Sequence, residues 1–110
     1  MRQVVPQPLT ETVLLILTSL ADQPRHGYAL IRDIARLSKG RVRMSTGTLY
    51  GALRRLLEDA WIERHEQEDT SRDKQAFRLT AAGRARLTAE LDRMKQLTRA
   101  AGARLRAREA

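Results

Sequence analysis

One short stretch, residues 45–55, holds the side chains with the most evident chemistry, and it reads Ser-Thr-Gly-Thr-Leu-Tyr-Gly-Ala-Leu-Arg-Arg. At about 100° per residue, a helix of this sequence places its leucines on one face and its hydroxyl groups, glycines and arginines on the other. The second face suits the major groove of DNA, because small residues permit close approach while polar side chains reach base edges and phosphates. We therefore expect DNA contacts from Ser45, Thr46, Gly47, Thr48, Tyr50, Gly51, Arg54 and Arg55.

The residue types in this stretch have distinct uses. Thr48 can contact a phosphate or a thymine methyl group, and Tyr50 can donate a hydrogen bond to a phosphate. The two arginines can reach phosphate or guanine. Glycine costs a helix about 0.5–1 kcal/mol relative to alanine, so Gly47 and Gly51 indicate that a flat surface matters here. Each residue alone is equally well explained as a solvated surface position, and only the face as a whole favours DNA.

The distribution of charge supports the same interpretation. The chain has 110 residues and a net charge of +8, from 21 Lys and Arg against 13 Asp and Glu. Residues 34–57 carry six basic side chains and no acid, and residues 93–108 carry another six without an acid. The rest of the chain is mildly acidic. A generally basic surface would explain the total but not this segregation, which is typical of a protein that binds nucleic acid. Arg43, in the first block, joins the expected DNA contacts.

Several other classes of function are disfavoured by what the sequence lacks. There is no cysteine, which excludes disulfides, thiolate metal sites and cysteine nucleophiles. His26 and His65 lie in different segments without a second ligand at metal spacing, so we expect no enzyme, metal or cofactor. No run reaches the roughly 18 apolar residues of a membrane span. Residues 1–8 lack the apolar core of a signal peptide, so we expect a cytoplasmic protein that contacts no membrane.

The periodicity of the apolar residues predicts three helices followed by a hairpin. Helical spacing covers residues 10–21, 27–38 and 45–59, with Ser45 as the N-cap of the third helix and Gly40 at the end of the second. The period then changes to two over residues 62–67 and 76–79, which predicts two strands. Residues 41–44 alternate basic and apolar side chains and predict a further minor strand. This order of elements is the layout of a winged helix-turn-helix domain.

A long final helix is expected from Thr80, whose hydroxyl can cap it, to about Arg108. Its apolar seam has the heptad spacing of a helix that packs against another helix. The apolar surface of this seam is larger than so small a domain can bury, so we expect the helix to pair with its copy in a homodimer. The alternative is a helix that folds back on its own domain. The fold class is thus mainly α (α+β), with a winged helix-turn-helix domain over residues 1–79 and a dimerisation helix over residues 80–110. The seam consists of Leu87, Leu91, Met94, Leu97, Thr98, Ala101 and Leu105.

Four motifs, in this order and spacing, resemble the PadR family of transcriptional regulators. They are His-Gly-Tyr at 26–28, Ser-Thr-Gly-Thr-Leu-Tyr at 45–50, Leu56 with Trp61-Ile62, and Phe-Arg-Leu-Thr-Ala-Ala-Gly-Arg at 77–84. The resemblance covers residues 9–97. It implies a dimeric winged-helix repressor of the short subgroup with one carboxy-terminal helix. The chain departs from the family at Thr46, where proline is usual, at Trp61, where glycine is common, and at Phe77, where tyrosine is usual.

The resemblance also assigns roles by position. Tyr28 corresponds to a tyrosine of the second helix that lies near the DNA backbone. Ser45, Thr46, Thr48, Tyr50 and Arg54 correspond to the surface of the recognition helix. Arg72 and Lys74 lie in the wing, but the surrounding acids Glu63, Glu66, Glu68, Asp69 and Asp73 predict that the wing adds little to DNA affinity.

Trp61 has two interpretations. In the simpler interpretation, Trp61 is a core residue between the third helix and the hairpin. In the more specific one, it borders a ligand cavity beside the last helix. The resemblance implies that some relatives sense phenolic acids or cationic drugs near the dimer interface. The lining of such a cavity for a small aromatic or cationic effector would come from Leu14, Trp61, Leu91 and Met94, none of which selects a ligand.

Together these features predict a sequence-specific regulator that binds double-stranded DNA, and specifically a homodimeric repressor at an inverted-repeat operator. The first alternative is an architectural protein that coats DNA without sequence preference, using the same basic faces. A second alternative is an interaction module that binds another protein, although an interface core usually carries aromatic anchors rather than arginines and glycines.

Overall fold

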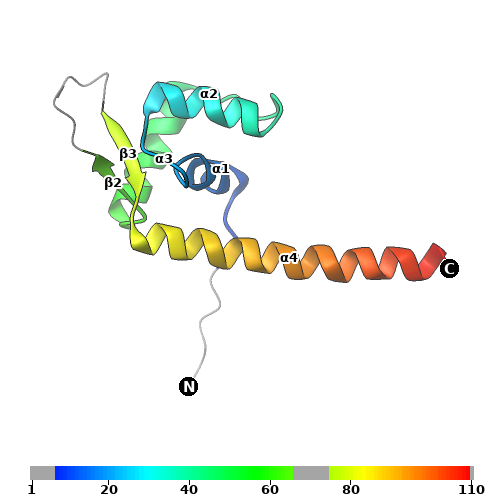
Figure 1. Cartoon of the computed structure of the whole chain (residues 1–110). Coiled ribbons are helices and arrows are strands. Elements are labelled where there is room, and N and C mark those ends of the chain that lie inside the picture. Colours follow the sequence, from blue (N-terminus) through cyan, green and yellow to red (C-terminus); the bar gives the residue numbers. More distant parts are fainter. Residues whose placement is uncertain (1–6, 66–74, 110) are drawn as a thin grey trace.

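The computed structural model describes residues 7–65 and 75–109 (Figure 1). Three helices and a small sheet form one body, and the last helix runs along its base and projects well beyond it. The predicted mainly α winged-helix fold with a long final helix is confirmed. The elements are α1 (Glu11–Ser19), β1 (Arg25–His26), α2 (Gly27–Leu37), α3 (Thr46–Glu58), β2 (Ile62–His65), β3 (Ala76–Leu79) and α4 (Ala81–Glu109).

Side-chain caps start three of the helices where hydroxyl residues precede an apolar stripe. Thr10 accepts a hydrogen bond from the Val13 amide at 3.2 Å, and Ser45 accepts one from the Thr48 amide at 3.2 Å. Thr80 accepts one from the Gly83 amide at 3.0 Å. Each bond satisfies a backbone donor that the first helical turn leaves without an acceptor. The predicted caps at Ser45 and Thr80 are confirmed.

Two helices end in residues with left-handed backbone conformation. After α2, Lys39 has φ 54° and Gly40 φ 82°, and the Gly40 amide donates to the Ala35 carbonyl at 2.7 Å. After α3, Ala60 has φ 59°, and the Trp61 amide donates to the Leu56 carbonyl at 3.0 Å. Both are helix-ending motifs that usually employ glycine in the left-handed position, because a Cβ atom is disfavoured there.

Ala60→Gly is therefore expected to stabilise the protein. Removing the Cβ relieves a left-handed conformation that costs a non-glycine residue about 1–2 kcal/mol, and we expect the free energy of unfolding to rise by about 1 kcal/mol. Urea unfolding measures the change. The control is Ala85→Gly, at an exposed interior position of α4, which should lower stability by about 0.5–1 kcal/mol. A loss of stability in Ala60→Gly would contradict this account of the turn.

The sheet has three strands in the order β1-β3-β2, all antiparallel. Arg25 and Arg64 both pair with Phe77, and His26 and His65 both pair with Ala76. The strand β1 was not predicted, because two residues are too short to show a period. Of the strand predicted over residues 62–67, residues 62–65 form β2. Residues 66 and 67 lie outside the described residues.

The prediction of a minor strand over residues 41–44 is wrong. Its alternation is real, since Met44 is buried while Arg43 is exposed, but none of the strands within residues 7–65 and 75–109 pairs with it. Instead, the Val42 amide donates to the Ser38 hydroxyl at 2.9 Å. The alternation therefore comes from an extended connection whose apolar side chains pack on the core.

The core gathers one side of every helix and the inner face of the sheet. Trp61 packs against this core and is partly buried, as its simpler interpretation predicts, and the Arg86 guanidinium lies 5.7 Å from the centre of its ring. Its backbone contacts α4 at Gly83, where no side chain would fit. The buried core residues include Ile16, Leu17, Leu30, Ile34, Leu49, Leu53, Leu56, Ile62, Phe77 and Leu87.

A buried polar network joins α1 to β1 and α2. The Ser19 hydroxyl donates to Asp33 at 2.6 Å, and the Arg25 Nε atom donates to the Ser19 carbonyl at 2.7 Å. The same Arg25 nitrogen lies 3.5 Å from the Asp33 carboxylate. Because the charge of Asp33 meets both a hydroxyl and a guanidinium, its burial is compensated, and α2 is held in a fixed position relative to α1.

Candidate nucleic-acid interface

The helix α3 separates its residues as the sequence predicts. Leu49, Leu53 and Leu56 are at most 1% exposed. The predicted DNA contacts on the opposite face are all exposed, namely Ser45, Thr46, Gly47, Thr48, Tyr50, Gly51, Arg54 and Arg55. One side of the helix thus holds the domain together, and the other presents hydroxyl groups, arginines and bare backbone to solvent.

The two glycines of α3 are not required by packing. A Cβ atom at Gly47 or Gly51 would have no other atom within 4 Å. The small residues leave a shallow hollow of about 310 Å³, lined by Gly47, Thr48, Gly51, Ala52 and Arg55. Since alanine would favour the helix at either position, the fold itself gives no reason for glycine here.

Tyr50 links α3 to α2. A Cβ atom at Gly27 would lie 2.5 Å from the Tyr50 hydroxyl oxygen, so the absence of a side chain at Gly27 lets the tyrosine lie against the start of α2. The N-cap of α2, His26, makes no side-chain hydrogen bond to the first helical turn. Tyr28 extends from that turn and is 67% exposed, with the Arg32 guanidinium 5.3 Å from its ring centre. The Tyr50 hydroxyl thus lies against the start of α2, where Tyr28 is exposed to solvent.

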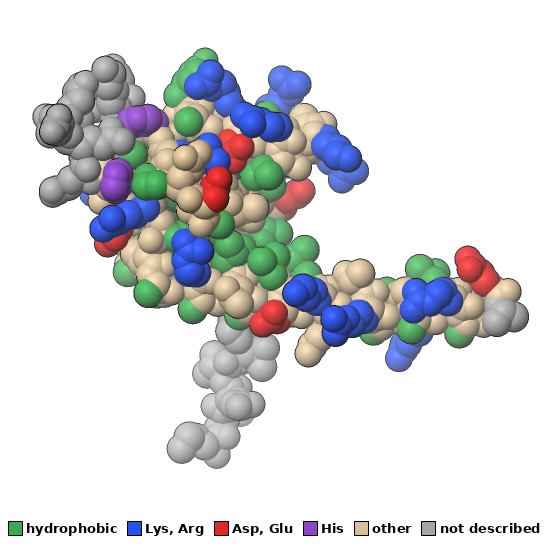
Figure 2. Space-filling view, in the orientation of Figure 1, with side chains coloured by type: hydrophobic (Ala, Val, Ile, Leu, Met, Phe, Trp, Pro, Cys, Tyr) green, Lys and Arg blue, Asp and Glu red, His purple; other side chains and the backbone are tan. Residues whose placement is uncertain are grey.

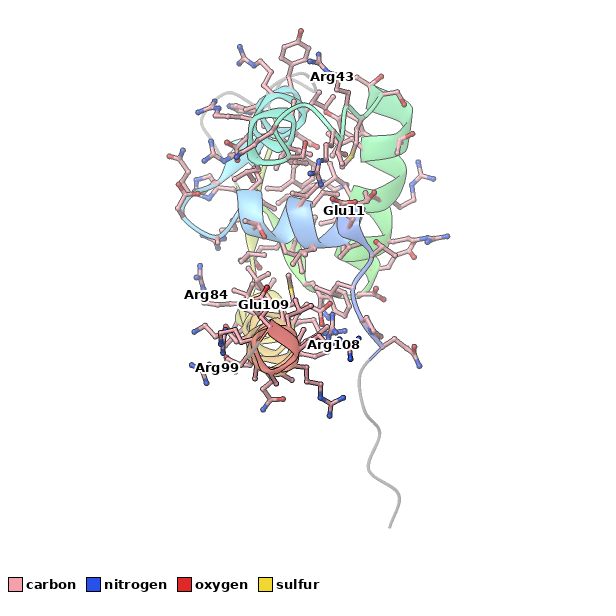
Figure 3. All side chains as sticks on the ribbon, turned by 90° about the vertical axis from the view of Figure 1, so that its right-hand side faces the viewer. Glu11, Arg43, Arg84, Arg99, Arg108 and Glu109 are labelled. Atoms are coloured by element: carbon pink, nitrogen blue, oxygen red, sulfur yellow. The ribbon has the colours of Figure 1, made fainter. Side chains whose placement is uncertain are left out.

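The two basic blocks of the sequence occupy different parts of the molecule. Figure 3 shows Arg43 at the end of the domain remote from α4, and Arg84, Arg99 and Arg108 around α4 itself. Only the first block therefore lies near α3. The predicted wing contacts, Arg72 and Lys74, lie outside the described residues.

Sequence reasoning missed one basic residue beside α3. Arg64 lies on β2 and shares the lining of a small notch with Tyr50 and Arg54. The period of two could have indicated it, because Ile62 and Arg64 must lie on the same face of the strand, and Ile62 is buried against the helices.

The seam of α4 begins further along the helix than the sequence predicts. Leu87 is only 6% exposed and belongs to the core of its own domain. Beyond it, the seam is open. Thr98 and Ala101 are exposed, and the large apolar side chains are 37–69% exposed, namely Leu91, Met94, Leu97 and Leu105.

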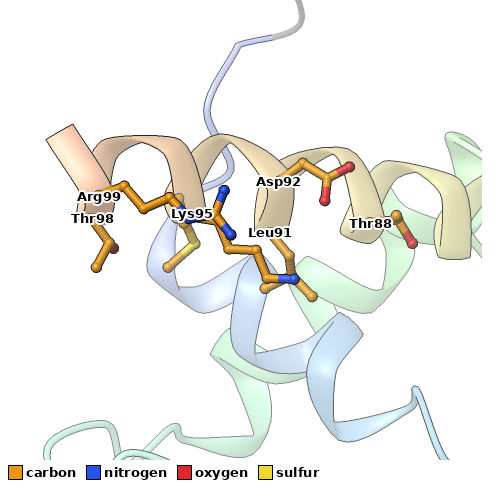
Figure 4. Close-up of a pocket in the computed structure, with 7 residues that line it drawn as sticks. Thr88, Leu91, Asp92, Lys95, Thr98 and Arg99 are labelled. Carbon is orange, nitrogen blue, oxygen red and sulfur yellow. The ribbon is translucent and has the colours of Figure 1, made fainter.

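An open groove of about 470 Å³ follows this part of α4, and all of its lining residues come from that helix (Figure 4). It contains Leu91 and Met94 of the predicted effector-lining set. Leu14 instead packs against the core, and Trp61 does not line the groove. Of the predicted set of four, this groove therefore brings together Leu91 and Met94. The lining residues are Thr88, Leu91, Asp92, Met94, Lys95, Thr98 and Arg99.

A buried carboxylate fastens the amino-terminal segment to α4. Glu90 is 3% exposed and accepts hydrogen bonds from Arg93 at 2.8 and 3.0 Å. It also accepts one from the Leu9 amide at 2.8 Å. The bonds from Arg93, with that from Leu9, outweigh the effect of burial and lower the pKa of Glu90 to about 2.

Glu90→Gln should destabilise the protein in a pH-dependent way. Because the pKa of Glu90 is lower in the folded chain than its usual value of 4.5, the ionised carboxylate stabilises the fold above about pH 4.5. That contribution is lost as the pH falls toward 2. The difference in melting temperature between the natural protein and the variant should therefore be largest near neutral pH and should become small as the pH falls toward 2. Asp92→Asn, which removes an exposed carboxylate of the same helix, is the control. A difference that stays constant with pH would contradict the assignment.

Comparison with known proteins agrees with the fold. Residues 16–89 match the Transcriptional regulator PadR-like family. The chain is 36% identical over 86 residues to Transcriptional regulator Rv3488 of Mycobacterium tuberculosis, which covers 78% of each protein. It is 39% identical over 85 residues to an uncharacterised 37.1 kDa protein in transposon TN4556 of Streptomyces fradiae, but spans only 23% of that protein's length.

The fold is also that of Bacillus subtilis PadR, solved in complex with operator DNA, with a TM-score of 0.65 and 20% identity over 77% of this chain and 48% of that one. Across the described residues, α4 and the other helices are too short or too polar to cross a membrane. The matched family region contains α2, α3 and the sheet, which together build the face described above. The chain belongs to the PadR-like family of transcriptional regulators.

Proposed function

We propose that this protein is a homodimeric repressor that binds an inverted-repeat operator, with α3 of each subunit in the major groove. The observation that carries the proposal is the exposed face of α3, where Gly51 leaves the backbone bare beside Arg54 and Arg55. The packing of the domain does not require Gly47 or Gly51. A need for α3 to approach another surface closely would explain why these positions are glycine. Operator DNA bound to Bacillus subtilis PadR supports DNA as that surface.

The individual contacts follow from position and chemistry. Arg54 and Arg55 reach guanine or phosphate, and Thr48 reaches a phosphate or a thymine methyl group. The exposed Tyr28 and the uncapped first turn of α2 face the backbone, where helical N–H groups attract phosphate. Ser45, Thr46 and Arg43 complete the contacts at the start of α3, and Arg72 and Lys74 add weak contacts from the wing.

The dimer is built by the projecting part of α4. Figure 2 shows hydrophobic side chains gathered in the angle where this helix leaves the domain, and basic side chains along its projecting part. A second copy packed on Leu91, Met94 and Leu97 covers apolar surface that the chain itself leaves exposed. Leu87 lies in the core of the DNA-binding domain, although it belongs to the predicted dimerisation helix over residues 80–110. The surface that pairs with the second copy therefore starts at Leu91.

Leu97→Glu tests the dimer. The substitution places a charge in the pairing surface at a position that is 60% exposed in the single chain, so the subunit should still fold. Sedimentation velocity should report a dimer for the natural protein and a monomer for the variant, with equal helix content by circular dichroism. A natural protein that sediments as a monomer at tens of micromolar would overturn the dimer.

Two-fold symmetry sets the geometry of the operator. The half-sites should lie about one helical turn, roughly 34–36 Å, apart and be related by inversion. Repression then follows from occupation of the promoter. An effector, small and aromatic or cationic, would bind beside Leu91 and Met94 between the subunits and change the separation of the two α3 helices. Release of bound DNA on titration with a phenolic acid or a cationic dye is its assay.

The test of the function is binding to the DNA immediately upstream of the protein's own gene. A mobility shift at about 150 mM salt, with an excess of unrelated duplex, should show a preference of about 10³-fold or more. Binding that the competitor removes would favour an architectural DNA-binding protein. The basic residues of α4, which lie away from α3, are the observation in favour of that alternative. Selection from random duplexes then decides, because an architectural protein enriches no sequence.

A further inference from the structure

A notch of about 160 Å³ lies where α3 meets the sheet, and the contacts proposed above do not account for it. Buried side chains, among them Leu53 and Phe77, form its apolar floor. Its rim is polar and comes from two elements that lie far apart in the sequence. The rim residues are Tyr50 and Arg54 from α3, Arg64 from β2, and Gln75 just before β3.

The register of the sheet directs Arg64 toward α3. Arg64 pairs with Phe77, and residues directly opposite in antiparallel strands project from the same face. Phe77 is 2% exposed and packs in the core, so the face it shares with Arg64 is the inner one. The neighbouring pair, Glu63 and Arg78, projects from the outer face, where their side chains bond at 2.7 Å.

The charges around the notch favour an anion. Arg54 and Arg64 are both exposed, and the described lining residues include no carboxylate. Two guanidinium groups around one small hollow repel each other, and an anion between them replaces this repulsion with two charge-assisted hydrogen bonds. The Tyr50 hydroxyl and the Gln75 amide are further donors at the rim. This set of donors matches a phosphate group.

We propose that the notch seats one phosphate of the DNA backbone, held by Arg54 from α3 and Arg64 from β2. The inference rests on the proposed function, since Tyr50 and Arg54 belong to the face that enters the groove. Arg64 then contributes affinity that is independent of base sequence. By holding a phosphate from the sheet side, it also fixes how α3 is rotated in the groove, so that the bases opposite Thr48 and Arg55 are determined.

The first test is the salt dependence of binding. Affinity for a mixed-sequence duplex of about 30 base pairs is measured as salt is raised, for the natural protein, Arg64→Ala, Arg64→Lys and Arg78→Ala. Losing one phosphate contact should reduce the slope of log K against log salt by about 0.9 for each bound subunit in Arg64→Ala. Arg64→Lys should keep the slope. Arg78→Ala, which removes the same charge from the outer face, should keep it too. Equal melting temperatures establish that the variants are folded.

The second test identifies the phosphate. In a duplex selected for tight binding, each phosphate is replaced in turn by an uncharged methylphosphonate. At one position in each half-site, the replacement should weaken the natural protein clearly more than it weakens Arg64→Ala, because the variant has already lost one of the two arginine contacts to that phosphate.

The outcomes separate the two proposals. If the natural protein binds no DNA even at low salt, the proposed function fails and the phosphate site fails with it. If the natural protein binds but Arg64→Ala keeps the full slope, or every methylphosphonate weakens Arg64→Ala by as large a factor as it weakens the natural protein, only the phosphate site is overturned.

Discussion

Replacing Tyr50 and Arg54 together by alanine should strongly weaken binding to the operator while the domain stays folded. Arg54 is exposed and Tyr50 is 42% exposed, so neither substitution opens a cavity in the core. A hydrogen bond to a charged group contributes about 1.5–3 kcal/mol, and a symmetric dimer loses the Arg54 contact in both half-sites. The affinity for the operator should therefore fall by about 10²-fold to 10⁴-fold, before the loss of the tyrosine contact is added.

The measurement is a mobility shift at about 150 mM salt with competitor DNA, beside a thermal melt. Arg78→Ala is the matched control, since it removes an arginine that is paired with Glu63 on the outer face of the sheet. Binding by the double variant with undiminished affinity for the operator would exclude α3 as the recognition helix. A large fall in melting temperature would instead show that the contact between Tyr50 and Gly27 supports the fold.

Gly83→Ala should be strongly destabilising, although alanine is ordinarily the better helix former. A Cβ at this position would overlap the Trp61 carbonyl and lie 2.8 Å from its carbon and 3.1 Å from the Trp61 Cα. The carbonyl cannot retreat freely, because it accepts a hydrogen bond from the Thr80 amide at 3.1 Å. Overpacking of this kind costs about 1–3 kcal/mol, and the rigid backbone partner places Gly83→Ala near the upper end. The melting temperature should fall by about 10 °C or more.

Gly51→Ala supplies the matched control. It makes the same chemical change in an α-helix, but at a position where the added methyl group meets nothing within 4 Å. It should raise stability by about 0.5–1 kcal/mol. A Gly83→Ala variant as stable as Gly51→Ala would show that α4 does not pack on Trp61 as the structure has it. The proposed function adds that Gly51→Ala, though more stable, should bind the operator less tightly.

The sequence is sufficient to predict the helices and the exposed face of α3. Leu49, Leu53 and Leu56 recur at helical spacing and are buried, and a burial stripe leaves the opposite side of a helix exposed. Ser45 and Thr80 could be assigned as caps because the need for an acceptor at the first helical turn is local. Such features depend on a few consecutive residues, and the sequence displays them directly.

Features that depend on distant residues could not be predicted in the same way. The strand β1 exists because Arg25 and His26 meet β3, about fifty residues along the chain. Residues 41–44 show the alternation of a strand but have no partner within the described chain, and alternation alone does not reveal that. The notch between Arg54 and Arg64 forms where a helix and a strand are brought together, so neither segment alone indicates it.

The close contact between Gly83 and the Trp61 backbone gives α4 the mechanics of a lever. The helix is 29 residues long, and at about 1.5 Å per residue it spans about 43 Å from a base that is wedged against the connection after α3. A tilt of about 5° at that base would displace the far end by about 4 Å, if the helix stays straight. The reverse also holds. In the proposed dimer, a small change in how the two α4 helices cross would reach the connection at the end of α3 through the contact between Gly83 and Trp61.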